Sequence, residues 1–167
     1  KTMVIATHNI FQAETMTTKV ALLLEGKIAQ IGAPEEIFRG SSEGLASFAR
    51  LENVFSGTSR ILEEGTSVIE VDDGIRIAAA LRKFGKVTVF VRPEDIILSK
   101  KAMASSARNV FEGKIVEASD FGSVVKLKVD AGKEFVVQIT KRSFLEMQLN
   151  VGSTVFLTFK ASSVHLI

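Results

Sequence analysis

Hydroxyl side chains lie at three places in the second half of the chain, and at two of them a cationic side chain accompanies them. The three groups are Ser106 with Arg108, Thr140 with Ser143, and Lys160 with Ala161 and Ser162. Fixed cations combined with hydroxyl donors suit a pocket for a small tetrahedral dianion. A phosphate monoester would need the same donors, so the residue types alone do not name the anion.

The spacing within two of these groups indicates how they are held. Ser106 and Arg108 are two residues apart, so on an extended strand their side chains point to the same side. Thr140 and Ser143 have the spacing of a helix N-cap and a residue in the first turn, whose free N–H groups can face an anion. Taken singly, each group is also typical of a turn cap or a solvated surface, so the prediction depends on their combination.

Catalytic residues are scarce. His8 follows a short apolar run, which is where open α/β sheets carry functional groups, but it has no evident partner nucleophile. The absence of cysteine excludes a disulfide scaffold, a thiolate metal site and a cysteine nucleophile. No Gly-x-x-x-x-Gly-Lys-Ser/Thr phosphate loop occurs. These residues do not make a complete enzyme, and we predict no metal site.

The composition excludes several classes of protein. The 167 residues are 46% hydrophobic and 24% charged, which is typical of one globular domain or two small ones. A net charge of +2 argues against a general nucleic-acid binder, and the lack of Trp and Tyr argues against a base-stacking platform. No apolar run approaches the roughly 18 residues of a membrane helix.

The first third of the chain has the pattern of an α/β fragment. Residues 3–6 form a continuous apolar run, which predicts a strand buried in a parallel sheet. A buried strand seldom begins a protein, so we expect this chain to be cut from a larger domain. The further predicted elements are a helix, a strand hairpin and a helix start, at residues 10–17, 20–31 and Pro34.

From Asn53 onward, short runs of period two separated by Gly and Asp turns predict an antiparallel sheet or small barrel. The sequence Asn-Val-Phe-x-Gly occurs at 53–57 and again at 109–113, and Arg92 then aligns with Lys160. A cation at the same end of the same strand favours an internal duplication. Chance similarity between small barrels, which all use Gly and Val at turns and strands, is the alternative.

The two repeats differ at the candidate anion groups. Arg50 and Glu52 stand in the first repeat where the second has Ser106 and Arg108, and the first repeat lacks the Thr-x-x-Ser insertion. A carboxylate repels an oxyanion, so we expect only the second repeat to bind one.

Residues 3–38, with VIATHN at 4–9, VALLLEGKI at 20–28 and IGAPEEIF at 31–38, resemble the end of an ABC importer ATPase subunit. The resemblance implies that His8 is the switch histidine, which contacts the γ-phosphate of Mg-bound ATP and the attacking water. It also implies that the phosphate loop lies upstream of Lys1, so this segment alone would not hydrolyse ATP. Residues 17–19 depart from the family, which usually has an acid and Arg there.

Residues 53–167, with VRPEDI at 91–96, resemble the TOBE type of OB-like barrel, and the second repeat is similar to molbindin-like (Mop) domains that bind molybdate or tungstate. That similarity implies that pockets form where two copies meet. It also implies seven anion contacts, namely Ser106, Arg108, Thr140, Ser143, Lys160, Ala161 through its backbone, and Ser162.

We therefore expect a mainly β chain with an α/β fragment: the end of a P-loop ATPase α/β domain followed by a duplicated OB-like (TOBE) antiparallel β-barrel. The expected domains are 1–52, 53–104 and 105–167. The expected function is the regulatory portion of the ATPase subunit of a molybdate/tungstate ABC importer, in which oxyanion bound by the barrel inhibits transport (trans-inhibition). The resemblance implies a homodimer, permease partners and a place on the cytoplasmic face of the membrane, and the composition predicts no nucleic-acid partner.

Two alternatives remain. The barrel could be a structural TOBE dimerisation module of a sulfate, sugar, polyamine or iron importer, with Arg108 and Lys160 as interface or surface groups. A free-standing oxyanion storage or gene-regulatory protein is the other, but the segment around His8 and the near-neutral charge argue against it.

Overall fold

The fold is mainly β, and every strand pair of the described residues is antiparallel. The chain forms two compact units, one of Lys1–Leu51 with Ile167 and one of Glu52–Leu166. No helix in the described part of the chain is long and apolar enough to cross a bilayer. The computed structural model describes residues 2–7, 13, 15–24, 26–34, 37, 51–62, 65–71 and 74–167.

The first unit contains the predicted strand hairpin, formed by β1 (Val20–Leu24) and β2 (Lys27–Gly32). Gly26 in the connecting turn has φ +77°, a conformation that glycine adopts without strain. The Ile37 N–H donates to the Ala33 carbonyl at 3.1 Å, as in the first turn of a helix that begins near Pro34.

The prediction of a buried strand at residues 3–6 is wrong. Residues 2–7 have no regular secondary structure, and the Val4 side chain is 92% exposed. A strand buried on both faces needs parallel neighbours, and the described residues contain no parallel pair. The α/β fragment is therefore not seen in this part of the chain, and His8 lies outside the described residues.

The second unit consists of two five-stranded sheets with matching strand orders. The first sheet runs β12 (Val164–Leu166), β6 (Gly85–Val91), β3 (Val54–Ile61), β4 (Ser67–Val71) and β5 (Arg76–Ala79). The second sheet runs β7 (Ile97–Ser99), β11 (Thr154–Phe159), β8 (Asn109–Asp120), β9 (Val124–Asp130) and β10 (Glu134–Thr140). The internal repeat predicts this equivalence of β3–β7 with β8–β12.

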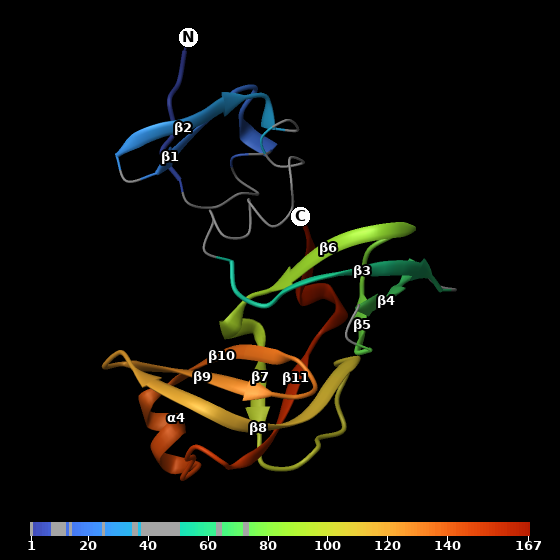
Figure 1. The fold of residues 1–167 in the computed structure, drawn as a ribbon, viewed down its shortest axis with the longest axis vertical. Helices are drawn as coiled ribbons and strands as arrows, with labels where there is room; N and C mark the ends of the chain where they lie inside the picture. The colour runs from blue at the N-terminus through green and yellow to red at the C-terminus, as the bar shows by residue number, and fades with distance from the viewer. Residues whose placement is uncertain are drawn as a thin grey trace. The chain divides into compact units, whose positions relative to one another are not determined.

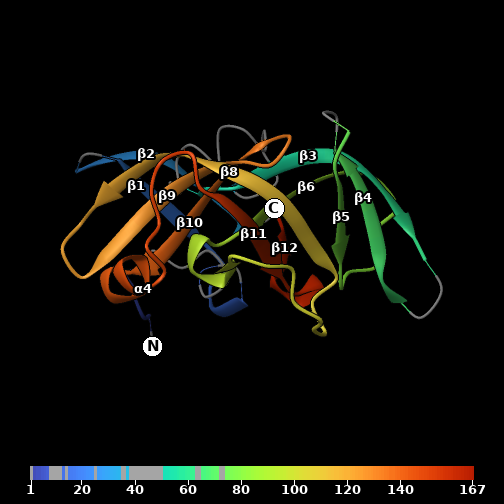
Figure 2. The same cartoon turned by 90° about the horizontal axis from the view of Figure 1, so that it is seen from below.

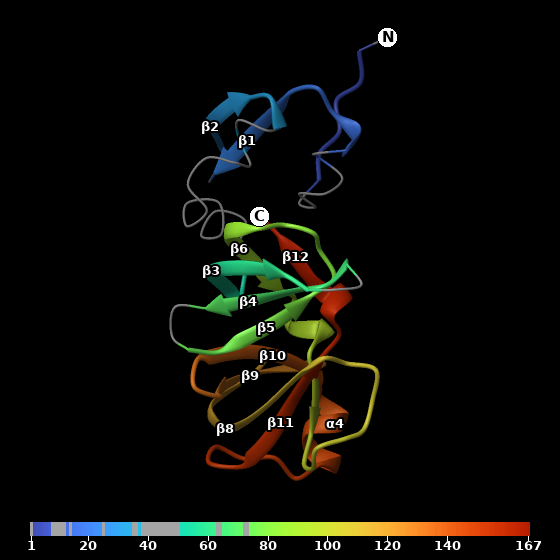
Figure 3. The ribbon, with the colours of Figure 1, turned by 90° about the vertical axis from the view of Figure 1, so that its right-hand side faces the viewer.

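The last strand of each repeat is exchanged. β7 belongs to the first repeat but pairs with β11, and β12 belongs to the second repeat but pairs with β6. Figure 1 shows the green β7 among the orange strands of the second sheet, and Figure 3 shows the red β12 beside β6. The 3-10 turns η2 (Pro93–Asp95) and η3 (Ala161–Ser163) lead into the exchanged strands. Neither sheet is made from one repeat alone.

The two sheets share one apolar core, in which the rings of Phe55 and Phe135 lie 5.0 Å apart. In β9 the predicted alternation is confirmed: Val125, Leu127 and Val129 are buried, and the lysines between them lie on the outer face. Alternation with a period of two is what gives a strand one buried face.

Candidate functional site

The short helix α4 (Lys141–Glu146) begins where the sequence predicts. Thr140 is its N-cap, and the Thr140 hydroxyl accepts a hydrogen bond from the Ser143 N–H at 3.1 Å. The two hydroxyls lie 2.9 Å apart. Lys141 forms an ion pair with Asp120, and this hydrogen bond lowers the pKa of the Asp120 carboxyl. The pair of predicted hydroxyl ligands is thereby fixed beside the C-terminal end of β8.

The cationic group lies at the N-terminal end of β8. Asn109 at the start of β8 pairs in register with Phe159 at the end of β11, so Arg108 and Lys160 leave the sheet side by side. Both side chains are exposed, and within the described residues neither has an ion-pair partner. Two unpaired cations next to each other favour an anionic ligand.

The remaining predicted contacts flank these two cations. Ser106 is exposed, two residues before Arg108. Lys160 occupies the position before η3; Ala161 in that turn is buried, and its carbonyl accepts from the Ala80 N–H at 2.9 Å. Ser162 is exposed.

One chain does not bring all seven predicted contacts together. β8 has twelve residues, a path of about 40 Å at roughly 3.3 Å per residue, and it separates the Thr140–Ser143 pair from the Arg108–Lys160 pair. Figure 2 shows β8 running from beside the red turn before β12 to the side of α4. A pocket using both pairs would need a second copy of the chain.

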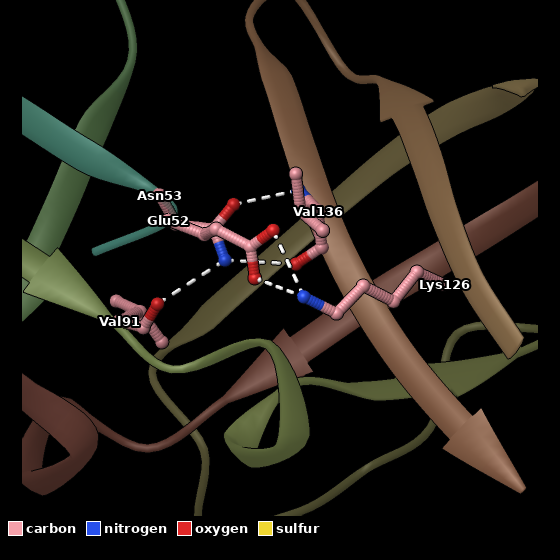
Figure 4. A network of polar contacts seen from close by, with 5 residues as sticks. All are labelled: Glu52, Asn53, Val91, Lys126 and Val136. Atoms are coloured by element: carbon pink, nitrogen blue, oxygen red, sulfur yellow. Dashed lines mark hydrogen bonds and ion pairs between the residues drawn. The ribbon is translucent and has the colours of Figure 1, made fainter. Parts of the chain in front are cut away.

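In the first repeat, the residue that aligns with Arg108 is a carboxylate whose charge is neutralised by an ion pair. Glu52 stands at that position, and both of its carboxylate oxygens accept from the Lys126 ammonium on β9, at 2.8 and 3.0 Å (Figure 4). A carboxylate bound in this way offers nothing to an oxyanion. The prediction that only the second repeat binds an oxyanion stays a prediction, and Arg50 lies outside the described residues.

Sequence reasoning missed the role of Asn53 and Asn109. The Asn53 amide donates to the carbonyls of Val91 (3.1 Å) and Val136 (2.8 Å) and accepts from the Val136 N–H (2.6 Å). Asn109 binds both main-chain groups of Ala78 in the same way, at 2.8 and 2.9 Å. The repeated Asn-Val-Phe-x-Gly motif was the available signal. An asparagine that recurs at the same position of two repeats can bind main-chain groups through its side-chain amide.

No group of three or more His, Asp or Glu side chains within the described ranges is arranged to hold a metal ion. Away from the candidate site, a hydrogen bond from Lys128 lowers the pKa of the Glu117 carboxyl. The candidate anion contacts offer hydroxyl groups at one end of β8 and positive charge at the other.

The chain resembles importer ATP-binding proteins over most of its length. It is 32% identical to the molybdate/tungstate import ATP-binding protein WtpC of Pyrococcus horikoshii over 99% of this chain and 47% of that protein. It is 34% identical to the spermidine/putrescine import ATP-binding protein PotA of a Nostoc species over 77% of this chain and 35% of that protein. The chain thus spans about half the length of the curated relatives it matches.

The fold also matches a solved structure, the cytoplasmic molybdate-binding protein ModG with molybdate bound. The TM-score is 0.62 and the identity 25%, over 70% of this chain and 95% of that one. Residues 105–166 match the TOBE domain family. The resemblance inferred from the sequence is thus confirmed: the chain contains a TOBE domain at residues 105–166, and over nearly its whole length it is homologous to the C-terminal region of the WtpC proteins.

Proposed function

We propose that the second repeat binds a tetrahedral oxyanion of the molybdate/tungstate type between two copies of the chain, and that this binding regulates the ATPase subunit of an ABC importer. The observation that carries the proposal is the pair of exposed cations, Arg108 and Lys160. They leave neighbouring strands side by side and have no ion-pair partner among the described residues.

The separation of the predicted ligands supports a site shared by two chains. The cations of one copy would meet the Thr140 and Ser143 hydroxyls of the other, because the two groups lie at opposite ends of β8. In a twofold dimer every contact occurs twice, which gives two sites for each dimer. The cations supply charge-assisted hydrogen bonds, and the neutral hydroxyls supply further donors without adding charge.

Regulation would follow from linkage. An anion stabilises the arrangement of two chains that completes its pocket, and it inhibits transport if that arrangement opposes the closure of the ATPase domains. In this proposal residues 1–52 are the end of a P-loop ATPase domain that binds ATP and Mg²⁺, with His8 as the switch histidine. The whole subunit would lie on the cytoplasmic face of the membrane and assemble with permease subunits.

Titration of the chain with sodium tungstate tests the proposal, with calorimetry to measure binding and sedimentation to measure association. We expect one tungstate for each chain and a dimer stabilised by it. Arg108→Glu replaces an attraction by a repulsion and should abolish binding. Arg92→Glu makes the same charge change in the first repeat and should leave binding intact. Absence of tungstate binding, or equal binding by Arg108→Glu, would refute the assignment.

A structural TOBE module without a ligand is the second candidate. The similarity to spermidine/putrescine import proteins favours it, because those relatives are named for import of a cation. In that case the chain would dimerise equally with and without tungstate, and neither the wild type nor the Arg108→Glu variant would bind tungstate. The same sedimentation measurement therefore separates the two candidates.

A further inference from the structure

A network of polar contacts holds the first two residues of the second unit. It consists of Glu52, Asn53, Val91, Lys126 and Val136, which we call the Glu52–Asn53 network (Figure 4). Asn53 is 8% exposed and has φ +55°, a conformation that asparagine tolerates better than most residues. The chain therefore enters this unit through a fixed, largely buried point.

The network joins both repeats. Asn53 binds Val91 at the end of β6 in the first repeat through its side chain, and the Val91 N–H donates to the Asn53 carbonyl at 3.2 Å. It also binds Val136 on β10 in the second repeat. Glu52 adds the ion pair with Lys126 on β9. The Glu52 side chain is 34% exposed and the Lys126 side chain is 33% exposed. A movement of β9 or β10 would therefore reach residues 52 and 53 directly.

β10 also carries one of the predicted hydroxyl ligands, Thr140, and Ser143 follows on α4. Thr140 ends β10 four residues after Val136, about 13 Å along a strand. Lys126 pairs across the sheet with Gln138, midway between these two positions. An anion that restrains β9 and β10 near Thr140 would therefore also restrain Lys126 and Val136, which bind Glu52 and Asn53.

The second repeat lacks one part of this arrangement. Asn109 binds Ala78 as Asn53 binds Val136, but Arg108 before it has no ion pair among the described residues. In that repeat the asparagine bonds are not accompanied by an ion pair from the preceding residue. The Glu52–Lys126 ion pair is therefore an addition at the one point where the chain comes from residues 1–51.

We infer that the Glu52–Asn53 network couples oxyanion occupancy of the second repeat to the segment before residue 52. The inference rests on the proposed function. Anion bound at Thr140 and Ser143 orders β9 and β10, and the Lys126 ion pair passes this restraint to Glu52. By reciprocity, a change in the segment before residue 52 alters the affinity for the anion.

Hydrogen–deuterium exchange of the full chain with and without sodium tungstate tests the coupling, with calorimetry on the same samples. In the wild type we expect tungstate to slow exchange in peptides that end before residue 52. Lys126→Met keeps the length of the side chain but removes the ion pair. It should still bind one tungstate for each chain and lose the effect on those peptides, and Glu52→Gln should do the same.

Lys128→Met is the matched control. Lys128 lies on the same face of β9 and pairs with Glu117 and Glu134 instead of Glu52, so this variant should keep both binding and the exchange effect. A Lys126→Met variant that keeps the exchange effect overturns the inference, as does a Lys128→Met variant that loses it equally. If the wild type binds tungstate but exchange in peptides before residue 52 is unchanged, the inference is overturned and the proposed function is not. A wild type that does not bind tungstate overturns the proposed function and the inference with it.

Discussion

Asn53 and Asn109 each place one amide against the edge strand of the other repeat's sheet. A carboxamide has a donor and an acceptor side by side, so it can pair with both main-chain groups of one residue, as a neighbouring strand would. Unpaired strand edges are sites of unwanted association, and buried main-chain groups need partners. These two side chains therefore close the edges of β10 and β5 at Val136 and Ala78.

Replacement of Asn109 tests this role. Asn109→Ala leaves the partly buried N–H and C=O of Ala78 without partners, and we expect the free energy of unfolding to fall by about 2–4 kcal/mol. Urea denaturation measures the change. Asn150→Ala, at an exposed asparagine, should change the free energy by less than about 0.5 kcal/mol. Equal effects of the two variants would contradict the role of Asn109.

His165 makes stability depend on pH. Its ring lies 5.2 Å from the Phe90 ring, and burial, followed by the nearby Arg92 charge, lowers the pKa of His165, with Asp95 acting in the opposite direction. The unfolded chain therefore takes up a proton more readily than the folded one. The free energy of unfolding should then fall as the pH drops below about 6.5, the ordinary pKa of histidine.

The His165→Phe variant tests this contribution, because it keeps a ring against Phe90 and cannot be protonated. Urea denaturation between about pH 7.5 and about pH 5.5, on either side of the ordinary pKa, should show a steeper loss of stability in the wild type than in the variant. Parallel pH profiles would show that His165 does not contribute. Arg92→Gln should reduce the loss, since it removes the repulsive charge.

Among the elements, β8 depends on a glycine. It pairs with β11 up to Lys114 and with β9 from Lys114 onward, and a Cβ at Gly113 would lie 2.6 Å from the Asp130 carbonyl oxygen. The Gly113→Ala variant should force the strands apart and cost about 1–3 kcal/mol in urea denaturation. Glu112→Ala, at the exposed neighbour, is the control and should cost less than about 0.5 kcal/mol. If Gly113→Ala leaves the free energy of unfolding unchanged, β8 can move to accommodate the added methyl group.

Local patterns predicted the elements that depend on local contacts. The alternation of Val125, Leu127 and Val129 predicted which face of β9 is buried. The Thr-x-x-Ser spacing predicted the N-cap of α4. The prediction of a buried strand at residues 3–6 was wrong because a buried parallel strand depends on its neighbouring strands and not only on its own sequence.

The strand exchange and the split site could not be predicted for a related reason. β7 and β12 occupy equivalent positions in the two repeats, so either could have paired with β6 or with β11 on local pattern alone. The order of the ligand motifs along the chain likewise does not reveal that β8 holds them apart. The resemblance alone indicated that two chains meet at the pocket.

At the scale of the whole molecule, the exchange of β7 and β12 predicts that the two sheets unfold together. Each sheet needs a strand from the other repeat, and both share one core. Ile69→Ala, at a fully buried position in the first sheet, should lower the free energy of unfolding by about 2–5 kcal/mol. Because the sheets cannot separate without losing an exchanged strand, we expect amide protection in β9 and β10 of the second sheet to fall by the same free energy. Native-state hydrogen exchange measures this. Faster exchange confined to β3–β6 would mean that the exchanged strands do not couple the sheets.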